Sequence, residues 1–300
     1  MRAVVIGLGT QGNKRLKSLN KKNYFVCSVD PINKKADESN ISNLKNYEYD
    51  TVFLCVPDQL KKKYIFHFLR EKKNIFVEKP LNLSKEVLLK IEKLSNIQKV
   101  RFYVGYNHRF EPHLIKTKEY LKKKLLGKIY CLKIYYGNGT AKLVNKSWRQ
   151  KKLDINDDLG SHLVDQLAFL FGIKKFKNIN SIKNSMENKT SDQSNIILNF
   201  NNILVNFEMT YCSWENTFIF YLIGSKGSIK IDNLCKWGPS TFKYQKRVFP
   251  SGKPVVRSKK LILPDPTWDN ELKYFNYLIK KKIKNNLQKD LFIQKLIKQF

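Results

Sequence analysis

The sequence predicts an α/β protein with two domains, a first built on a parallel sheet and a second of α+β type with an open, largely antiparallel sheet. Short buried strands alternate with amphipathic helices in the first third of the chain, and longer strands of alternating polarity follow. The 300 residues are 42% apolar, which is enough for two cores. We therefore expect one domain over residues 1–118 and another over residues 119–300.

The first domain shows the strand, helix, strand order of βαβ units. Helices are expected near Asn13–Leu19 and Tyr64–Leu69 and over Ser84–Leu94, with Ser84 as the N-cap. Five short strands are expected, at Ala3–Ile6, Phe25–Val29, Thr51–Val56, Asn74–Val77 and Arg101–Gly105. Such units predict a parallel sheet with right-handed crossovers.

The second domain carries longer strands joined by turns at Asn201-Asn202 and Gly224–Gly227. The expected strands are Lys128–Tyr136, Ser194–Phe200, Ile203–Tyr211, Thr217–Ile223 and Ser228–Ile231. Helices are expected at the domain boundary and within the second domain, over Pro112–Leu125, Leu159–Phe171 and Trp268–Lys282. This pattern predicts an antiparallel sheet with helices on one face.

Apolar side chains of the second sheet are expected to need a partner. Val205, Phe207, Ile219 and Tyr221 are assigned to one hydrophobic face, and the sequence offers few helices to cover it. Exposed apolar faces of this kind are typical of subunit contacts. We expect a homodimer or homotetramer, with the second domain serving in substrate binding and oligomerisation.

The charge of the chain is strongly positive. Lysine and arginine outnumber the acidic residues 57 to 25, for a net charge of +32. The excess runs along the whole chain, so biased composition explains it better than a nucleic-acid or membrane surface, and no nucleic-acid recognition motif is present. We expect no nucleic-acid partner, and an anionic substrate is favoured only weakly.

Composition also indicates the compartment. No apolar run is long enough for a membrane span, and no secretory signal precedes the first strand. Five cysteines are scattered without CxxC spacing, and Cys27 and Cys55 fall within expected strands. We expect reduced thiols in a cytoplasmic protein that does not bind a membrane.

A glycine motif directly follows the first strand. Gly7, Gly9 and Gly12 form GxGxxG, with Thr10 and Gln11 opening the helix that follows. Gly7 permits a tight turn, Gly9 lets a pyrophosphate approach the backbone, and Gly12 permits close packing of helix and strand. The diphosphate would then lie on the helix N-terminus. The motif predicts a Rossmann domain that binds a dinucleotide.

An acidic residue ends the second strand. Asp30 is placed to accept hydrogen bonds from the adenosine ribose and to repel a 2′-phosphate, which favours NAD over NADP. Asp30 could instead only begin the Asp30-Pro31 turn, and Lys34 and Lys35 leave NADP open as a cofactor.

A lysine ends the fourth strand, in Glu78-Lys79-Pro80. Ligands of open α/β sheets bind at the carboxyl ends of the strands, and Pro80 keeps Lys79 out of helical geometry. Its ammonium could bond a reacting hydroxyl and stabilise a developing alkoxide. In so basic a chain, a lysine at a strand end carries little weight by itself.

The second domain supplies carboxylates and a histidine. Asp158 and His162 are four residues apart at the start of a helix, and Asp165 follows three residues later on the same side. A positioned imidazole is a natural base for removing a hydroxyl proton as hydride leaves. A capping aspartate and a core histidine are the structural alternative.

Together these motifs resemble the glucose–fructose oxidoreductase / inositol dehydrogenase / MocA (Gfo/Idh/MocA) family over nearly the whole chain. Glu78-Lys79-Pro80 with a later DxGxHxxD helix is the specific part of the resemblance. The other matching segments are Gly7–Gly12, Val56-Pro57, Asn74–Leu81, Gly105–Phe110, Trp148-Arg149, Asp158–Gln166, Leu170–Gly172 and Gly224–Ser228.

The resemblance implies a Rossmann domain followed by an open-sheet domain, and NAD(P)-dependent oxidation or reduction of ring hydroxyls without a metal. It maps the family's catalytic lysine, aspartate and histidine onto Lys79, Asp158 and His162. Cofactor contacts would come from Gly7, Gly9, Thr10, Gln11, Gly12, Asp30, Val56, Pro57, Glu78 and Lys79. Candidate substrate contacts are Tyr106, Asn107, Arg109, Trp148 and Arg149.

One departure from the family pattern concerns the segment after the third strand. The family often has Pro-Asn-x-x-His there, whereas this chain has Pro57-Asp58-Gln59-Leu60-Lys61, so that lysine replaces the histidine. The substrate therefore stays open among sugars, cyclitols and nucleotide sugars.

The expected reaction is hydride transfer between the nicotinamide and a secondary alcohol carbon. His162 exchanges the hydroxyl proton, Asp158 orients His162, and Lys79 steadies the oxygen. Two alternatives stay open: a dinucleotide-binding sensor without catalysis, and an enzyme that recycles its bound NAD.

Overall fold

The computed structural model describes residues 1–145 and 154–300, and their contacts divide the chain into two compact units. Unit 1 comprises Met1–Asn107 and Thr267–Gln294, and unit 2 comprises His108–Pro266 and Lys295–Phe300. The expected ranges differ from this division, because a segment near the C-terminus packs in unit 1.

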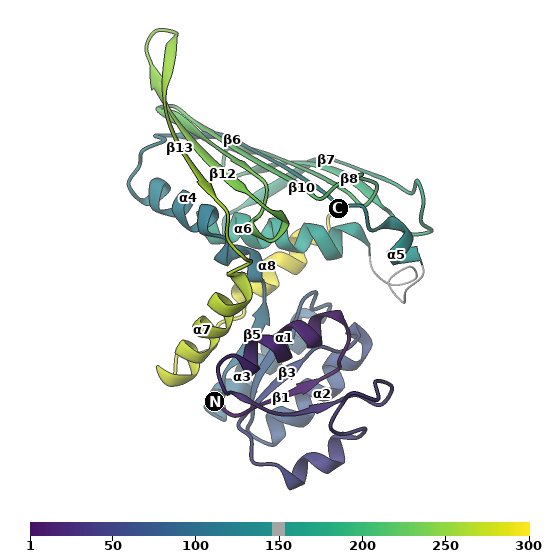
Figure 1. Ribbon diagram of the computed structural model, residues 1–300. Helices are drawn as coiled ribbons and strands as arrows, with labels where there is room; N and C mark the ends of the chain where they lie inside the picture. The colour runs from purple at the N-terminus through teal and green to yellow at the C-terminus, as the bar shows by residue number, and fades with distance from the viewer. Residues whose placement is uncertain (146–153) are drawn as a thin grey trace. The chain divides into compact units, whose positions relative to one another are not determined.

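Unit 1 is built on a five-stranded parallel sheet in the order β2-β1-β3-β4-β5 (Figure 1). The strands are β1 (Ala3–Ile6), β2 (Phe25–Val29), β3 (Thr51–Leu54), β4 (Asn74–Glu78) and β5 (Phe102–Gly105). The helices are α1 (Thr10–Asn20), η1 (Ile41–Asn46), α2 (Asp58–Arg70), α3 (Lys85–Ile97), α7 (Thr267–Lys280) and the first part of α8 (Gln288–Ile297). The predicted parallel sheet is confirmed, and β3 ends earlier than expected, so that Cys55 follows the strand.

The core of unit 1 explains why α7 belongs to it. Leu272 and Phe275 of α7 are buried against sheet residues that include Val5, Phe53 and Phe76. Phe275 meets the rings of Phe53 and Phe76 edge-on, with centroids 5.9 and 5.4 Å apart. An amphipathic helix at the end of the sequence could cover either sheet, and only these long-range contacts assign it to the first.

Unit 2 is built on an eight-stranded sheet in the order β13-β12-β11-β10-β6-β9-β8-β7, antiparallel except for the β6–β9 pair. The strands are β6 (Ile129–Gly137), β7 (Phe176–Asn184), β8 (Gln193–Phe200), β9 (Ile203–Thr210), β10 (Thr217–Gly224), β11 (Gly227–Asp232), β12 (Ser240–Val248) and β13 (Gly252–Leu261). The helices are α4 (Pro112–Lys122), α5 (Ala141–Asn145), the π-helix η4 (Asn156–Gly160), α6 (Ser161–Phe171) and η5 (Cys235–Trp237), and η2 (Asn107–Phe110) begins at the last residue of unit 1. The predicted, largely antiparallel sheet is confirmed.

Three strands of this sheet and helix α8 were not expected from the sequence. The edge strand β7 is mostly polar, and every residue of the edge strand β13 is at least partly exposed. Edge strands lack the buried apolar alternation that marks a central strand, and lysines are common on them. Sheet pairing, and not local pattern, therefore defines these two edge strands.

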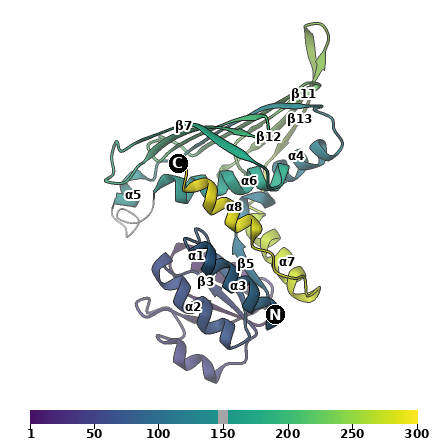
Figure 2. The same ribbon diagram turned by 180° about the vertical axis from the view of Figure 1, so that it is seen from behind.

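The two faces of the unit 2 sheet correct one expectation. Phe207, Ile134 and Phe220 are neighbours in the register and are buried. Ile219 alternates with Phe220 and lies on the opposite face, as Tyr221 does. The assignment of these two residues to one face with Val205 and Phe207 was wrong. The buried face is covered by α4 and α6, as both views show (Figures 1 and 2).

Within the described parts of the chain, no helix combines the length and the apolar character that crossing a bilayer requires.

Candidate active site

The register of the unit 1 sheet gathers the expected cofactor residues at one edge. Ile6 pairs with Val29 and Leu54, Leu54 pairs with Val77, and the carboxyl ends of the strands are therefore level. β2 lies on one side of β1 and β3 on the other, so the connections from β1 to β2 and from β2 to β3 run in opposite directions, which makes this edge a topological switch point. The segments at or directly after these strand ends are Gly7–Gly12, Asp30, Val56-Pro57, Glu78-Lys79 and Tyr106-Asn107.

The three motif glycines meet different surroundings. Gly7 has a φ of +92°, and a Cβ there would lie 2.6 Å from the Cys55 carbonyl oxygen. A Cβ on Gly12 would lie 1.9 Å from the Gly7 carbonyl oxygen. A Cβ on Gly9 would meet no described atom within 4 Å. Packing thus requires glycine at positions 7 and 12, whereas the space beside Gly9 is open to an approaching ligand.

The N-terminus of α1 follows this loop. Gly9 is the N-cap residue and offers no side-chain cap, and the first turn contains Thr10 and Gln11 but no acidic residue. The backbone N–H groups of a first helical turn have no partner inside the helix and favour an anion. The loop and helix start can therefore hold the diphosphate of a dinucleotide.

Asp30 braces the glycine loop. Its Oδ2 accepts a hydrogen bond from the Leu8 N–H at 2.7 Å, and its Oδ1 accepts from Ile32 and Asn33 N–H at 2.9 Å each. Burial opposes the charge, but these three backbone donors outweigh it and lower the pKa of Asp30. The carboxylate therefore holds both the loop and the turn, and its bond to a ribose stays a prediction.

Two asparagines that we did not expect complete this brace. Asn13 and Asn33 both donate side-chain hydrogen bonds to the Leu8 carbonyl oxygen, at 2.8 and 3.0 Å. The only local signal for these two residues in the sequence is their position. Asn13 lies one residue beyond the glycine motif, and Asn33 lies within the turn after β2.

Glu78 is held by a buried arginine. The Arg15 Nε lies 2.5 Å from the Glu78 Oε1, and the Arg15 Nη2 lies 2.6 Å from the Glu271 Oε2. All three side chains are buried, and the charges of both glutamates raise the pKa of Arg15 against the opposing effect of burial. Glu78 thus has a structural partner, and its expected contact with the cofactor stays a prediction.

Tyr106 and Asn107 are also engaged within unit 1. Asn107 Nδ2 donates to the Thr267 Oγ1 at 2.9 Å. The Lys289 ammonium lies over the Tyr106 ring, 5.1 Å from its centroid, and Tyr106 is buried. These contacts join the end of β5 to the C-terminal helices, and substrate binding by either residue stays a prediction.

In unit 2 the expected carboxylates lie on the π-helix η4 and on the α-helix α6 that follows it. Asp158 lies in η4, where its Oδ2 accepts a hydrogen bond from the buried Tyr211 hydroxyl at 2.9 Å. Asp165, fully buried in α6, forms a two-point ion pair with Arg109. A short π-helix next to an α-helix often marks a functional site. The pairing gives Arg109 a structural role, and its contact with substrate stays a prediction.

His162 lies in a cluster that the sequence revealed only in part. Its ring stacks on the His108 ring, with centroids 3.8 Å apart and planes 14° apart. Lys236 Nζ lies 3.0 Å from the His108 Nε2 and donates to the Tyr136 hydroxyl at 3.2 Å. We did not predict His108, Tyr136 or Lys236 as site residues, because they come from η2, β6 and η5, far apart in the sequence.

A buried glutamate lies near this cluster. Glu111 Oε2 accepts from the Cys235 N–H at 3.3 Å, and burial raises the pKa of Glu111 to about 7 despite that bond and the Lys236 charge. Glu111 therefore titrates near neutral pH. No sequence pattern indicates this residue, since one glutamate before a proline is typical of an ordinary helix start.

Trp148 and Arg149, two of the expected substrate residues, lie outside the described residues.

Comparison with known proteins decides the family. Residues 1–106 match the Gfo/Idh/MocA oxidoreductase family with an NAD-binding Rossmann fold, and residues 114–230 match the Gfo/Idh/MocA C-terminal domain. The chain belongs to the Gfo/Idh/MocA family. The resemblance found in the motifs is confirmed, and residues 1–106 of unit 1 are the family's NAD-binding Rossmann domain.

Individual relatives are distant. The chain is 28% identical over 125 residues to inositol 2-dehydrogenase of Rhizobium meliloti, a match that covers 42% of this chain and 37% of that protein. It is 22% identical over 245 residues to glucose-6-phosphate 3-dehydrogenase of Bacillus subtilis, covering 76% and 68%. Levoglucosan dehydrogenase in complex with NADH has a TM-score of 0.84 at 15% identity, covering 99% of this chain and 95% of that chain. The match to the inositol dehydrogenase spans little more than a third of that protein, and the structural likeness shows the fold.

Lys61, which replaces the histidine that the Gfo/Idh/MocA family often has after the third strand, is held by contacts within unit 1. Lys61 is buried, forms an ion pair with Asp58 at 3.0 Å and donates to the Pro80 carbonyl oxygen. Burial lowers the pKa of Lys61, against the opposing charge of Asp58. The lysine therefore links the start of α2 to the segment that contains Lys79.

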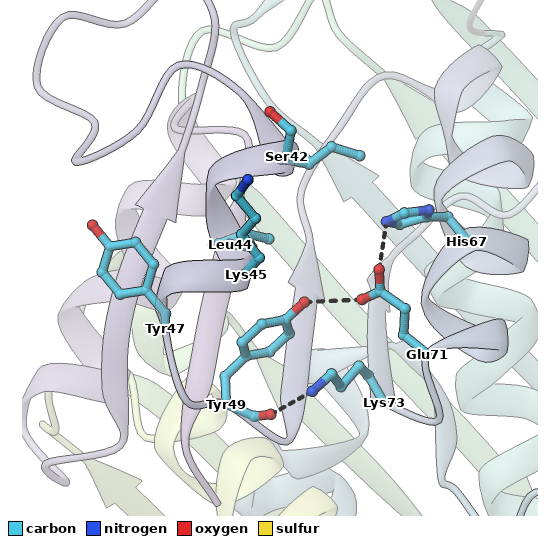
Figure 3. Close-up of a pocket in the computed structure, with 9 residues that line it drawn as sticks. Ser42, Leu44, Lys45, Tyr47, Tyr49, His67, Glu71 and Lys73 are labelled. Atoms are coloured by element: carbon cyan, nitrogen blue, oxygen red, sulfur yellow. Dashed lines mark hydrogen bonds and ion pairs between the residues drawn. The ribbon is translucent and has the colours of Figure 1, made fainter.

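A separate hollow of about 590 Å³ lies in unit 1 (Figure 3). Tyr49 and Lys73 line it just before β3 and β4, which places it at the amino edge of the sheet, away from the glycine loop. Glu71 accepts from the Tyr49 hydroxyl at 3.0 Å and lies 3.1 Å from the His67 Nε2. None of the expected site residues that the structure describes lines this hollow.

Proposed function

We propose that this chain is an NAD-dependent dehydrogenase that moves a hydride to or from a ring hydroxyl of a sugar, cyclitol or nucleotide sugar. The observation that carries the proposal is the presence, in one chain, of an open glycine loop on unit 1 and a buried histidine cluster with adjacent carboxylates in unit 2. The relatives named for inositol, glucose 6-phosphate and levoglucosan support a ring polyol as substrate.

The proposed chemistry divides between cofactor and protein. The nicotinamide, when bound, accepts or gives the hydride, and the protein supplies alignment and charge. Gly7–Gly12 would hold the diphosphate, with Val56, Pro57 and Glu78-Lys79 along the same sheet edge. Asp30 would accept hydrogen bonds from the adenosine ribose. The carboxylate favours NAD, while the exposed Lys34 and Lys35 leave NADP binding open.

The proton would move at His162. Its ring would take the hydroxyl proton during oxidation and return it during reduction, and Asp158 would help to orient it. Lys79 would stabilise negative charge on the oxygen. Tyr106, Asn107, Arg109, Trp148 and Arg149 are proposed as substrate contacts.

We further propose a homodimer or homotetramer in the cytoplasm. Leu204 and Ile219 lie on the sheet face of unit 2 opposite Phe207 and Phe220, and they are 48% and 37% exposed. A second subunit would bury them. Five free thiols support a reducing compartment. Light scattering at micromolar concentration tests the assembly, and a monomer that is stable on dilution would contradict it.

The test of the activity is a panel of inositols, hexoses, hexose phosphates and nucleotide sugars incubated with NAD or NADP, with reduced nicotinamide as the readout. We expect one class of ring polyol to be oxidised with NAD. Tight NAD binding without oxidation of any member would favour the sensor. Conversion of a substrate without added cofactor would favour an enzyme that recycles its bound NAD.

A further inference from the structure

His108 and His162 form a buried pair of stacked imidazoles in unit 2. Their centroids are 3.8 Å apart, their planes differ by 14°, and their exposed fractions are 1% and 7%. Two rings in face contact, shielded from water, cannot both carry a positive charge without strong repulsion. The pair therefore holds at most one extra proton, and its neighbours decide which ring receives it.

Lys236 contacts the His108 ring of the pair. Its Nζ lies 3.0 Å from the His108 Nε2 and 3.2 Å from the Tyr136 hydroxyl. An ammonium group has three donors and no acceptor, so the Nε2 of His108 must accept this hydrogen bond. An imidazole that accepts at Nε2 is neutral and carries its proton on Nδ1. Lys236 thus excludes a proton from the very nitrogen that it contacts.

Two carboxyl groups, those of Asp158 and Glu111, also belong to this part of unit 2. Asp158, one turn before His162, accepts from Tyr211, and its negative charge acts on the α6 side of the pair. Glu111 accepts from the Cys235 N–H, and burial raises its pKa to about 7, so its charge is largely absent below neutral pH. Lys236 is therefore the charged group that lies at hydrogen-bond distance from a ring nitrogen of His108.

We infer that Lys236 and His108 are positioning residues for His162. Lys236 keeps His108 neutral by occupying its Nε2 lone pair, and the neutral His108 ring holds the His162 ring by stacking. The proton of the pair then resides on His162 alone. This inference rests on the proposed function only where it calls His162 the proton-exchanging group; the arrangement of charge can be tested without substrate.

The test is a pH titration by imidazole NMR. The chain contains four histidines, so single substitutions assign every ring signal. In the wild type we expect only one member of the stacked pair, His162, to take up a proton as the pH is lowered. In Lys236→Met, His108 should become protonatable, with its midpoint moving upward by about one pH unit, the usual effect of removing a contacting like charge.

The matched control is Lys116→Met in the same unit. The Lys116 ammonium lies over the Phe242 ring, and its charge helps to lower the pKa of His113, after the larger effect of burial. The control should move the His113 signal upward and leave His108 and His162 unchanged. His108→Phe keeps an aromatic ring for stacking and removes the lone pair, so the His162 midpoint should stay close to the wild-type value.

Turnover then separates the two proposals. If a substrate is known, Lys236→Met should move the acidic limb of kcat/KM to higher pH, because the pair is protonated more easily and a proton on either ring weakens His162 as a base. A His108 midpoint that does not move in Lys236→Met would overturn the inference. A moved midpoint in a protein that oxidises no substrate would leave the inference standing and sink the proposed function.

Discussion

The glycine loop of unit 1 and the histidine cluster of unit 2 are built in opposite ways. The loop consists of six consecutive residues, and backbone packing requires two of its three glycines, Gly7 against Cys55 and Gly12 against Gly7. The cluster takes His108, Tyr136, His162 and Lys236 from four elements spread along the unit. A site made of backbone can therefore be read from spacing, whereas a site made of side chains depends on pairing between distant segments.

The largest expected effect would come from adding one methyl group to the loop. A Cβ on Gly12 would overlap the Gly7 carbonyl oxygen, so Gly12→Ala should lower the free energy of unfolding by roughly 3 kcal/mol, the upper range for overpacking. Gly9→Ala is the matched control, since its Cβ meets open space. It should leave the free energy of unfolding nearly unchanged, yet weaken NAD binding by about tenfold or more, equal to about 1.4 kcal/mol.

Urea unfolding and NAD titration of both variants check this contrast. Equal stability losses in the two variants would show that the loop's shape does not depend on the Gly7–Gly12 contact. Undiminished NAD affinity in Gly9→Ala would show that the diphosphate lies elsewhere.

The same contrast explains how much the sequence could predict. Strand and helix periodicity predicted the parallel sheet and the antiparallel sheet, and the glycine spacing predicted the Gly7–Gly12 loop. Local spacing also predicted Asp158 and His162. Local patterns could not predict that Lys236 belongs to the cluster, because its position depends on the pairing of β11 with β12. They also could not predict the packing of Phe275 in unit 1. Ile219 was placed on the wrong face because one residue of register reverses every side chain of a strand.

The two regions should also respond to pH in opposite directions. The folded protein keeps the proton of Glu111 up to about pH 7, whereas the unfolded chain loses it near the ordinary value of 4.5. The Glu111 contribution to the free energy of unfolding therefore falls as pH rises through this window and is constant above it. The pKa of Asp30 is lowered instead, so the stability it adds is present above its ordinary range and is lost in acid.

Glu111→Gln tests the larger of these effects. The variant keeps an acceptor for the Cys235 N–H but cannot lose a proton. Relative to wild type it should gain stability on the order of 3 kcal/mol between about pH 5 and pH 8. Urea unfolding at the two pH values gives the difference, and a difference independent of pH would show that Glu111 is not held protonated.

A smaller effect is expected for cofactor choice in unit 1. Asp30→Asn removes the charge and retains an oxygen acceptor for the loop N–H groups. The ratio of NADP to NAD affinity should then rise by about tenfold, or about 1.4 kcal/mol, because a 2′-phosphate no longer faces a carboxylate. Nicotinamide fluorescence titration measures both affinities. An unchanged ratio would assign the choice to Lys34 and Lys35.

The central claim is that unit 1 holds the dinucleotide and unit 2 supplies the group that moves the proton. The most direct measurement is turnover and NAD affinity of His162→Ala, on the substrate found by the panel. Turnover should fall by roughly 10²–10⁴-fold, the range for a positioned acid–base group, while NAD affinity changes by no more than a few-fold. Lys79→Ala should do comparable damage, and Asp158→Asn should do less. Turnover at the wild-type rate in His162→Ala, with NAD bound normally, would contradict the account.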